Sequence, residues 1–329
     1  MASEIKLKPL APSTEYKCTV EECDVEDRIA LDKYRAKREE WLRWYDLGSD
    51  EPNSIQRQIF SMIFLDLAYR ILAGPRATNE TSGTATQNGF LAHFMDQGYV
   101  ATQILAIRRL LDKRGDVISI RRLLNDISEN KNLVTREIYV SYNGLPYDPN
   151  SWQSSHQEDD PMIMMWGIEA PGLNNYLASN ERHKVFDRLS GVPAGVRKRS
   201  DQISDKIFEK LTQWLDTSPA ETLITLSHKF FAHAADKASL DSLQYSGVSL
   251  NDIAAAQKAI VRVERAITDE ILFVGIARGV VPSPVLGFYK GLDSPFASSA
   301  STEKMYSHWQ ELAGERNSWL KGIADELTA

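Results

Sequence analysis

Apolar residues recur at helical spacing through most of this chain, and that spacing restricts the fold more than any other feature of the sequence. Few windows alternate apolar and polar residues as a half-buried strand does. One segment holds five apolar residues four apart, which line one face of a helix: Ile55, Ile59, Ile63, Leu67 and Ile71. Another holds four residues seven apart, the pattern of a helix packed lengthwise on a neighbour: Ile253, Ile260, Ile267 and Val274. The sequence therefore predicts an all-α protein.

Start and stop signals place the predicted helices along the chain. We expect helices over 26–47, from Pro52 to Gly74-Pro75, and over 88–114 and 118–127. Helices resume near 180, with an amphipathic segment at 203–214, a helix from Ser218 that bears His233, and helices over 249–278 and 301–327. Residues 131–180 contain four prolines and break the helical pattern, and Ile138-Tyr139-Val140 is their one plausible strand. We interpret this stretch as a long irregular insertion on the bundle. The predicted division is an N-terminal extension over 1–25, a helical bundle over 26–278, a linker or packed loop over 279–300 and a C-terminal helix over 301–329.

Charge and cysteine content argue against several classes of protein. A formal net charge of −7 and a pI near 5.5 argue against a protein that coats nucleic acid without specificity. The two cysteines, Cys18 and Cys23, indicate neither a disulfide framework nor a zinc site, and we expect no metal and no cofactor. No stretch approaches the roughly 20 apolar residues of a membrane span, and no secretory signal is evident. We therefore expect a cytoplasmic protein with no membrane contact.

One segment combines three polar groups with an apolar stripe. The run Ser-Pro-Ala-Glu at 218–221 is a helix start, with Ser as N-cap, Pro at the first position and Glu at the third. Lys229, His233 and Asp236 follow at spacings of four and three, so they share one helical face. The adjoining face carries the apolar residues Leu223, Leu226, Phe230 and Ala234. Such a helix can be a catalytic or binding element, or a structural helix with a solvated flank.

Two blocks resemble the HEPN superfamily, helical-bundle proteins of prokaryotic defence and toxin systems, and most closely its abortive-infection U-type branch. The first block is Ile107–Lys113 followed by Ile118–Leu124, and the second is Lys229–Asp236. With the connecting helices the resemblance covers 55–275. Many HEPN proteins are metal-independent ribonucleases marked by an Arg, four to six further residues and a His near a helix end. The resemblance thus implies a HEPN-like bundle that acts on RNA, with His233 as the catalytic residue and Lys229 and Asp236 assisting.

The chain departs from the HEPN motif at its arginine. No Arg lies between 218 and 233, and Ser227 and His228 stand six and five residues before His233. Cleaving RNA without a metal needs a base for the 2′-hydroxyl, an acid for the leaving oxygen and a fixed cation near the phosphate. His233 can serve as the acid or the base near neutral pH. Lys229 offers one point charge where a guanidinium would grip phosphate at two points, and Asp236 could orient the imidazole.

Two basic segments are candidates for a phosphate-binding surface. Six Lys or Arg stand against two acids within 104–122, and six against one within 182–199. We assign RNA or phosphate contacts to seven residues: Arg108, Arg109, Arg121, Arg122, Arg182, Lys184 and His228. Such runs are also typical of plain solvated faces. Glu264, beside the apolar seam of 253–274, could pair with His233 or Lys229, and His183 has no metal-ligand partner at helical spacing.

Three functions stay open at this point. The first is a metal-independent endoribonuclease of a defence or toxin system. The second is a non-catalytic HEPN-like module that binds RNA or a partner protein from a neighbouring gene, and the missing Arg favours it. The third is a structural helical protein with no nucleic-acid role. The resemblance also implies a homodimer, and the seam of 253–274 is apolar enough to join one.

Overall fold

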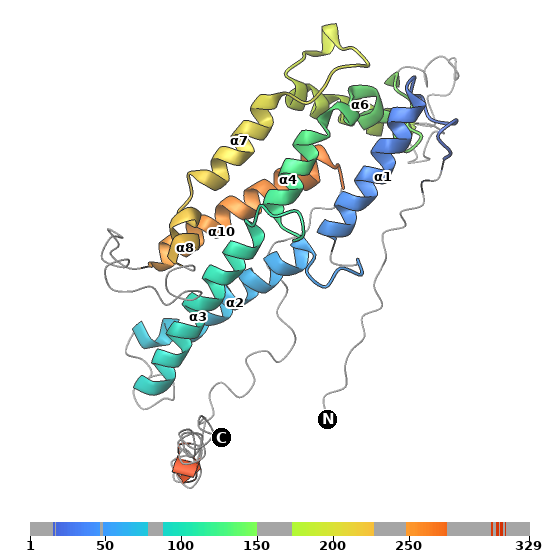
Figure 1. The fold of residues 1–329 in the computed structure, drawn as a ribbon. Helices are drawn as coiled ribbons and strands as arrows, with labels where there is room; N and C mark the ends of the chain where they lie inside the picture. Colours follow the sequence, from blue (N-terminus) through green and yellow to red (C-terminus); the bar gives the residue numbers. More distant parts are fainter. Residues whose placement is uncertain are drawn as a thin grey trace, which may run out of the picture. The chain divides into compact units, whose positions relative to one another are not determined.

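The structure is a computed structural model that describes residues 16, 18–46, 49–77, 88–149, 173–226 and 248–274, with positions 304, 307, 308, 310, 311 and 313. Helices account for most of these ranges (Figure 1): α1 Arg28–Tyr45, α2 Ile55–Ala77, α3 Gly89–Leu110, α4 Ile120–Glu129, η2 Lys131–Leu133, α5 Arg136–Ser141, α6 Leu173–Ser190, η4 Ala194–Val196, α7 Asp205–Asp216, α8 Ala220–Leu226, α10 Leu250–Arg265 and η6 Ala266–Ile271. Within them Thr135 and Gln202 form an isolated bridge, and no strand occurs. The predicted all-α fold is confirmed.

The chain divides into two compact units, Met1–Ala68 with Gln97–Pro282, and Tyr69–Asp96 with Ser283–Ala329. Helices α2 and α3 each begin in one unit and end in the other. In the second unit the Tyr69 hydroxyl donates a hydrogen bond of 2.7 Å to Asp96, which ties the two helices together there. In the first unit Gln103 on α3 donates to the Met62 carbonyl on α2. The two helices are thus linked within each unit.

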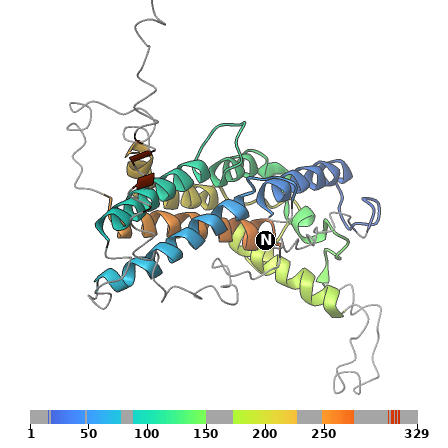
Figure 2. The ribbon, with the colours of Figure 1, turned by 90° about the horizontal axis from the view of Figure 1, so that it is seen from below.

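Helix α10 supplies much of the core of the first unit. Helices α4, α7 and α8 all contact it, and the π-helix η6 continues it. The predicted apolar seam is enclosed from Ile253 to Ile267, since Ile253, Ile260 and Ile267 have no exposed surface, whereas Val274 is half-buried. The interpretation of this seam as a dimer joint is therefore wrong over 253–267, because the chain's own helices cover it there. Figures 1 and 2 show α8 and α6 at opposite ends of the α10–η6 helix.

Local caps fix several helix starts. The Ser249 and Asp252 side chains each accept a hydrogen bond from the other's backbone N–H, which forms a capping box at the start of α10. The Ser218 hydroxyl accepts from the Ala220 N–H at 3.3 Å, so α8 begins where the sequence predicts. Leu223 and Leu226 of α8 are buried, which confirms the packing face for the described part of this helix.

The segment predicted as an insertion contributes to the core. Ile138-Tyr139-Val140 lies in helix α5, which the Thr135 side chain caps by accepting from the Ile138 N–H, so the strand prediction is wrong. All three side chains are buried, and α5 packs against α6. Residues 131–149 therefore form part of the bundle, and α6 begins at Leu173 instead of near 180. A short β-branched apolar run fits a strand and a buried helix equally well, which explains the error.

Two further observations bear on the predictions. Helix α2 continues to Ala77, beyond the predicted stop at Gly74-Pro75, because a proline in a last turn removes only one backbone hydrogen bond.

Among the described helices, none combines the length and the apolar character required to cross a membrane.

Candidate functional site

The predicted catalytic group lies beyond the last described residue of α8. Lys229, His233 and Asp236 fall within 227–247, outside the described residues, and so does His228. The structure does describe the helix that leads into them, with Leu223 and Leu226 facing the core. Glu264 lies on α10, and its Oε1 accepts a 2.6 Å hydrogen bond from the Tyr45 hydroxyl of α1. Glu264 Oε1 is thus engaged within the core, while the predicted pairing of Glu264 involves His233 and Lys229, which lie outside the described residues.

The predicted phosphate ligands Arg121 and Arg122 are both engaged in the fold. Arg121 is buried at the start of α4 and forms an ion pair with Asp216, the last residue of α7. Arg122 lies over the Trp44 ring, with its guanidinium carbon 4.0 Å from the ring centroid, and donates to the Val117 carbonyl. These contacts hold α4 against α7 and α1. Arg121 also lies close to the start of α8, because Asp216 precedes Ser218 by two residues.

Arg108 and Arg109 occupy the last turn of α3. Arg109 is exposed, and its guanidinium lies 3.4 Å from the Asn53 side-chain oxygen. Arg108 is half-buried and has partners of its own. A cation in the last turn of a helix also stabilises the negative end of the helix dipole. Arg109 is thus the most solvent-accessible of the four predicted arginines on α3 and α4.

On α6, Arg182 is buried and serves the fold, whereas Lys184 is exposed. The Arg182 guanidinium donates to the Val140 carbonyl at 2.7 Å and to the Asn143 side chain at 2.8 Å. It also lies over the Tyr142 ring. Lys184 lies 3.8 Å from Glu181 on the surface. Because α6 and α8 lie at opposite ends of the α10–η6 helix, these two residues do not gather near the start of α8 (Figures 1 and 2).

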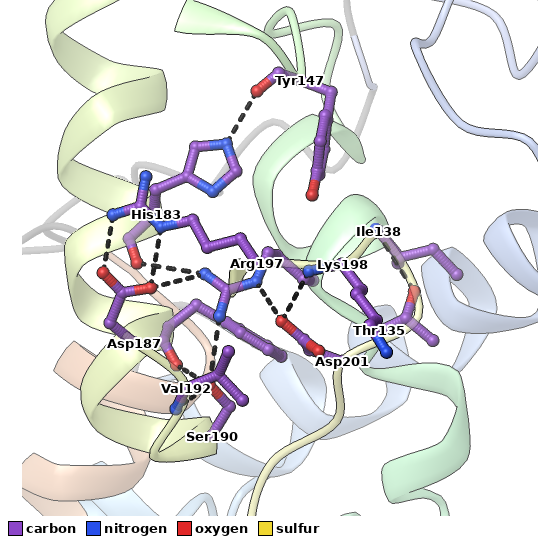
Figure 3. A network of polar contacts seen from close by, with 12 residues as sticks. Thr135, Ile138, Tyr147, His183, Asp187, Ser190, Val192, Arg197, Lys198 and Asp201 are labelled. Atoms are coloured by element: carbon purple, nitrogen blue, oxygen red, sulfur yellow. Dashed lines mark hydrogen bonds and ion pairs between the residues drawn. The ribbon is translucent and has the colours of Figure 1, made fainter. Parts of the chain in front are cut away.

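Arg136 forms a buried charge cluster with Asp187 and Asp201, which Figure 3 shows among their polar neighbours. Its side chain has no exposed surface, and its guanidinium donates to Asp201 and Asp187 at 2.8 Å each. The remaining donors reach Ser190 Oγ and the His183 carbonyl. The cluster joins α5, α6 and the loop before α7. Every nitrogen of this guanidinium has an acceptor and none of the side chain is exposed, so Arg136 holds the fold together and is closed to a ligand.

The basic run 197–199 adds to this cluster instead of forming a basic surface. Arg197 donates twice to Asp187, at 2.9 and 2.6 Å. Arg199 forms ion pairs with Asp24, Glu26 and Glu137. Burial raises the pKa of Asp187, but the hydrogen bonds from Arg197 and Arg136 outweigh it and hold the pKa below its ordinary value. The acids of α5, α6 and the N-terminal segment therefore neutralise these arginines.

His183 beside this cluster has a defined tautomer. Its Nε2 lies 2.7 Å from the Tyr147 carbonyl, which can only accept, so Nε2 carries the proton in the neutral ring. Nδ1 is buried, with no hydrogen-bond partner among the described groups. Burial lowers the pKa of His183, with the Tyr147 carbonyl acting in the opposite direction. The Tyr147 ring lies edge-on to the His183 ring, with 5.0 Å between the ring centroids. A neutral imidazole whose Nδ1 lone pair is buried, packed against a tyrosine ring, fits a structural role.

The described residues thus give the predicted cations unequal roles. Arg121, Arg122 and Arg182 bind other parts of the fold, whereas Arg109 and Lys184 are exposed. The sequence analysis did not identify Arg136, because its segment was assigned to an irregular insertion. Had 136–141 been predicted as a buried helix, an arginine in it would have required carboxylate partners. No group of His, Cys, Asp and Glu that could hold a metal occurs in the described part of the chain.

Comparisons with known proteins give no further guidance: no family model matches the chain, and no curated protein or solved structure is significantly similar to it.

Proposed function

We propose that this chain is a HEPN-like helical-bundle protein that acts on RNA in a prokaryotic defence or toxin setting, as a metal-independent endoribonuclease that uses His233. The observation that carries the proposal is the Lys229, His233 and Asp236 group on the chain directly after α8. The helical bundle and the start of α8 after Ser218 are the described features that agree with it.

The buried residues of α8 set the helical phase used in this proposal. At about 100° per residue, a helix continued from Leu223 and Leu226 carries His233 about 20° from the direction of Leu226. Lys229 and Asp236 then lie about 60° and 80° from Leu226, on the side away from Leu223. On this helical projection of the sequence, His233 would border the apolar stripe, and Lys229 and Asp236 would project further from it. An imidazole in that position can touch a bound substrate and still be held by packing.

In the proposed reaction His233 moves the proton at the 2′-hydroxyl or at the leaving oxygen, since imidazole titrates near neutral pH. Lys229 supplies positive charge at the phosphate, and Asp236 orients the imidazole or stabilises its charged form. A homodimer that brings two such histidines to one cleft is part of the proposal. Its contact surface must be other than the α10 seam, because that seam is buried.

The test is cleavage of end-labelled RNA by the purified chain in the presence of EDTA. The proposal expects cleavage, and expects His233→Ala to slow it by about 100-fold or more, the usual contribution of a general acid or base. His308→Ala is the matched control, because His308 is an exposed histidine whose Nδ1 lies 3.3 Å from the Glu311 carboxylate. Absence of cleavage, or equal loss in both variants, contradicts the enzymatic proposal.

A second candidate is a non-catalytic HEPN-like module that binds RNA or a partner protein from a neighbouring gene. The specific observation in its favour is that Arg121, Arg122 and Arg182 are held by Asp216, Trp44 and backbone carbonyls. With no Arg between 218 and 233, these contacts leave fewer arginines for a phosphate. This candidate predicts RNA retardation that weakens with salt, or a stable complex on co-purification, without cleavage. Unchanged RNA mobility at all salt concentrations and an uncomplexed protein would contradict it.

A further inference from the structure

The two cysteines of the chain lie against each other. Cys18 and Cys23 have their sulfur atoms 3.4 Å apart, and both are free thiols. Cys18 is half-buried, whereas Cys23 is 5% exposed. The sequence contains no other cysteine, so each thiol has a single intramolecular partner. Two thiols in contact, one of them on a less buried residue than the other, have the arrangement of an attacking and a resolving cysteine.

The surroundings of the sulfurs are fixed by a buried arginine. Arg35 Nη2 lies 3.0 Å from the Cys23 sulfur and 3.4 Å from the Cys18 sulfur. The same guanidinium donates to the Tyr142 carbonyl at 2.9 and 2.7 Å, so α1 and the end of α5 both hold it in place. A fixed cation beside a thiol favours the thiolate, which is the nucleophilic form.

The turn after α5 leaves space for the Cys18 sulfur only because it contains a glycine. Gly144 has a φ of +92°, and a Cβ at this position would lie 2.9 Å from the Cys18 sulfur. Cys23 donates toward the Thr19 carbonyl at 3.4 Å and lies 3.8 Å from the Tyr142 carbonyl. The pair is therefore seated against α1 and the 142–144 turn, and the 18–23 segment itself closes the loop between the two sulfurs.

We propose that Cys18 and Cys23 form a reversible oxidation site for hydroperoxides. Cys18 loses its proton and attacks the peroxide oxygen: an S–O bond forms, the O–O bond breaks, an alcohol or water leaves, and Cys18 becomes a sulfenic acid. Cys23 then attacks the Cys18 sulfur, an S–S bond forms, and the hydroxyl departs as water with the Cys23 proton. In total two thiols and one hydroperoxide give one disulfide, one alcohol and one water. A dithiol reductant restores the thiols.

The order of the two steps follows from exposure. Cys18 is half-buried, whereas Cys23 is buried and enclosed by Tyr142, Thr19 and Arg35. Burial and the contact with Cys18 raise the pKa of Cys23 to about 11, against which the Arg35 charge acts only in part. Cys23 alone is therefore a poor first nucleophile near neutral pH. It meets a sulfenic acid at Cys18 without any long movement of the chain.

The experiment treats the full-length reduced protein with one equivalent of hydrogen peroxide and measures intact mass and free thiols. The proposal expects loss of two hydrogens, a fall from two titratable thiols to none, and full recovery with dithiothreitol. Cys23→Ser should accumulate a sulfenic acid at Cys18, which a 1,3-diketone traps. Cys18→Ser should react about tenfold or more slowly, because only the buried thiol remains.

Three outcomes overturn the proposal. They are an unchanged mass with two thiols retained, a disulfide found only between two chains, and Cys18→Ser reacting as fast as Cys23→Ser. Misfolding of the single-serine variants is checked separately: the far-UV circular dichroism of each variant must match that of the parent before its rate is used. If one variant fails this check, the parent protein's mass and thiol count decide the question alone. The result is independent of the proposed RNA function.

Discussion

Replacing Arg136 with methionine tests whether the buried charge cluster holds α5, α6 and the loop before α7 together. Methionine keeps much of the side-chain length and the contact with Phe186 but supplies no donor. Asp187 would retain Arg197, and Asp201 would retain the Lys198 N–H at 3.0 Å. Each carboxylate therefore loses the buried Arg136 cation, but Asp187 keeps two hydrogen bonds from Arg197 and Asp201 keeps one from the Lys198 N–H.

The expected cost follows from burial. Removing one partner of a buried ion pair costs about 3–5 kcal/mol, and the retained donors favour the lower value, about 3 kcal/mol. Arg188→Met is the matched control, because Arg188 forms an ion pair of the same 2.8 Å length with Glu270 while its side chain is 57% exposed. A surface pair of that kind contributes at most about 1 kcal/mol.

The assay is urea unfolding followed by far-UV circular dichroism for the parent, Arg136→Met and Arg188→Met proteins. With a urea m-value of about 1–3 kcal/mol/M, Arg136→Met should lower the midpoint by about 1 M or more, and Arg188→Met by clearly less. Equal midpoint shifts in the two variants would refute the reasoning, since burial would then make no difference to the value of the pair.

Three further predictions concern single side chains of the first unit. Glu264→Gln should raise the melting temperature relative to the parent protein, and the difference should grow as pH rises above about 4.5, because burial raises the folded-state pKa of Glu264 and the unfolded chain releases that proton more readily. A variant that is no more stable than the parent at pH 7 would contradict this. Asp187→Asn should lower the free energy of unfolding at pH 7, and its difference from the parent should disappear as pH falls below the ordinary pKa of 3.8 and through the lower folded-state pKa of Asp187. Calorimetry across that pH range is the check, and a difference that does not change with pH would contradict the prediction. Trp41→Phe should cost about 1–3 kcal/mol in urea unfolding, because the 2.6 Å hydrogen bond from the indole to Asp126 is lost, and no loss would show that this bond is dispensable.

Local signals in the sequence were sufficient for several elements. The caps at Ser218 and Ser249 act within three residues, so the starts of α8 and α10 can be predicted without knowledge of the rest of the chain. The heptad spacing of the 253–267 seam likewise identifies a packed face. Which partner covers that face is a tertiary fact, and the prediction that a second subunit covers it failed for that reason.

The charge cluster depends on contacts between distant positions. Arg136 pairs with Asp187 and Asp201, which lie 51 and 65 residues further along the chain. The sequence shows 182–199 as a basic run, whereas the folded chain supplies acids to it from α5 and the N-terminal segment. The phosphate ligands predicted at Arg121 and Arg182 likewise turn out to be buried, because a count of charges does not show which of them fold inward.

The proposed function rests most directly on the 2′-hydroxyl as the attacking group and on His233 as the residue that moves a proton at that hydroxyl or at the leaving oxygen. The decisive measurement is the initial rate of cleavage, in EDTA, of one labelled RNA and of the same RNA carrying 2′-O-methyl groups. The proposed function predicts that the parent protein cleaves only the unmodified RNA, and that His233→Ala cleaves this RNA about 100-fold or more slowly. Cleavage of the methylated RNA, or undiminished cleavage by His233→Ala, would contradict it.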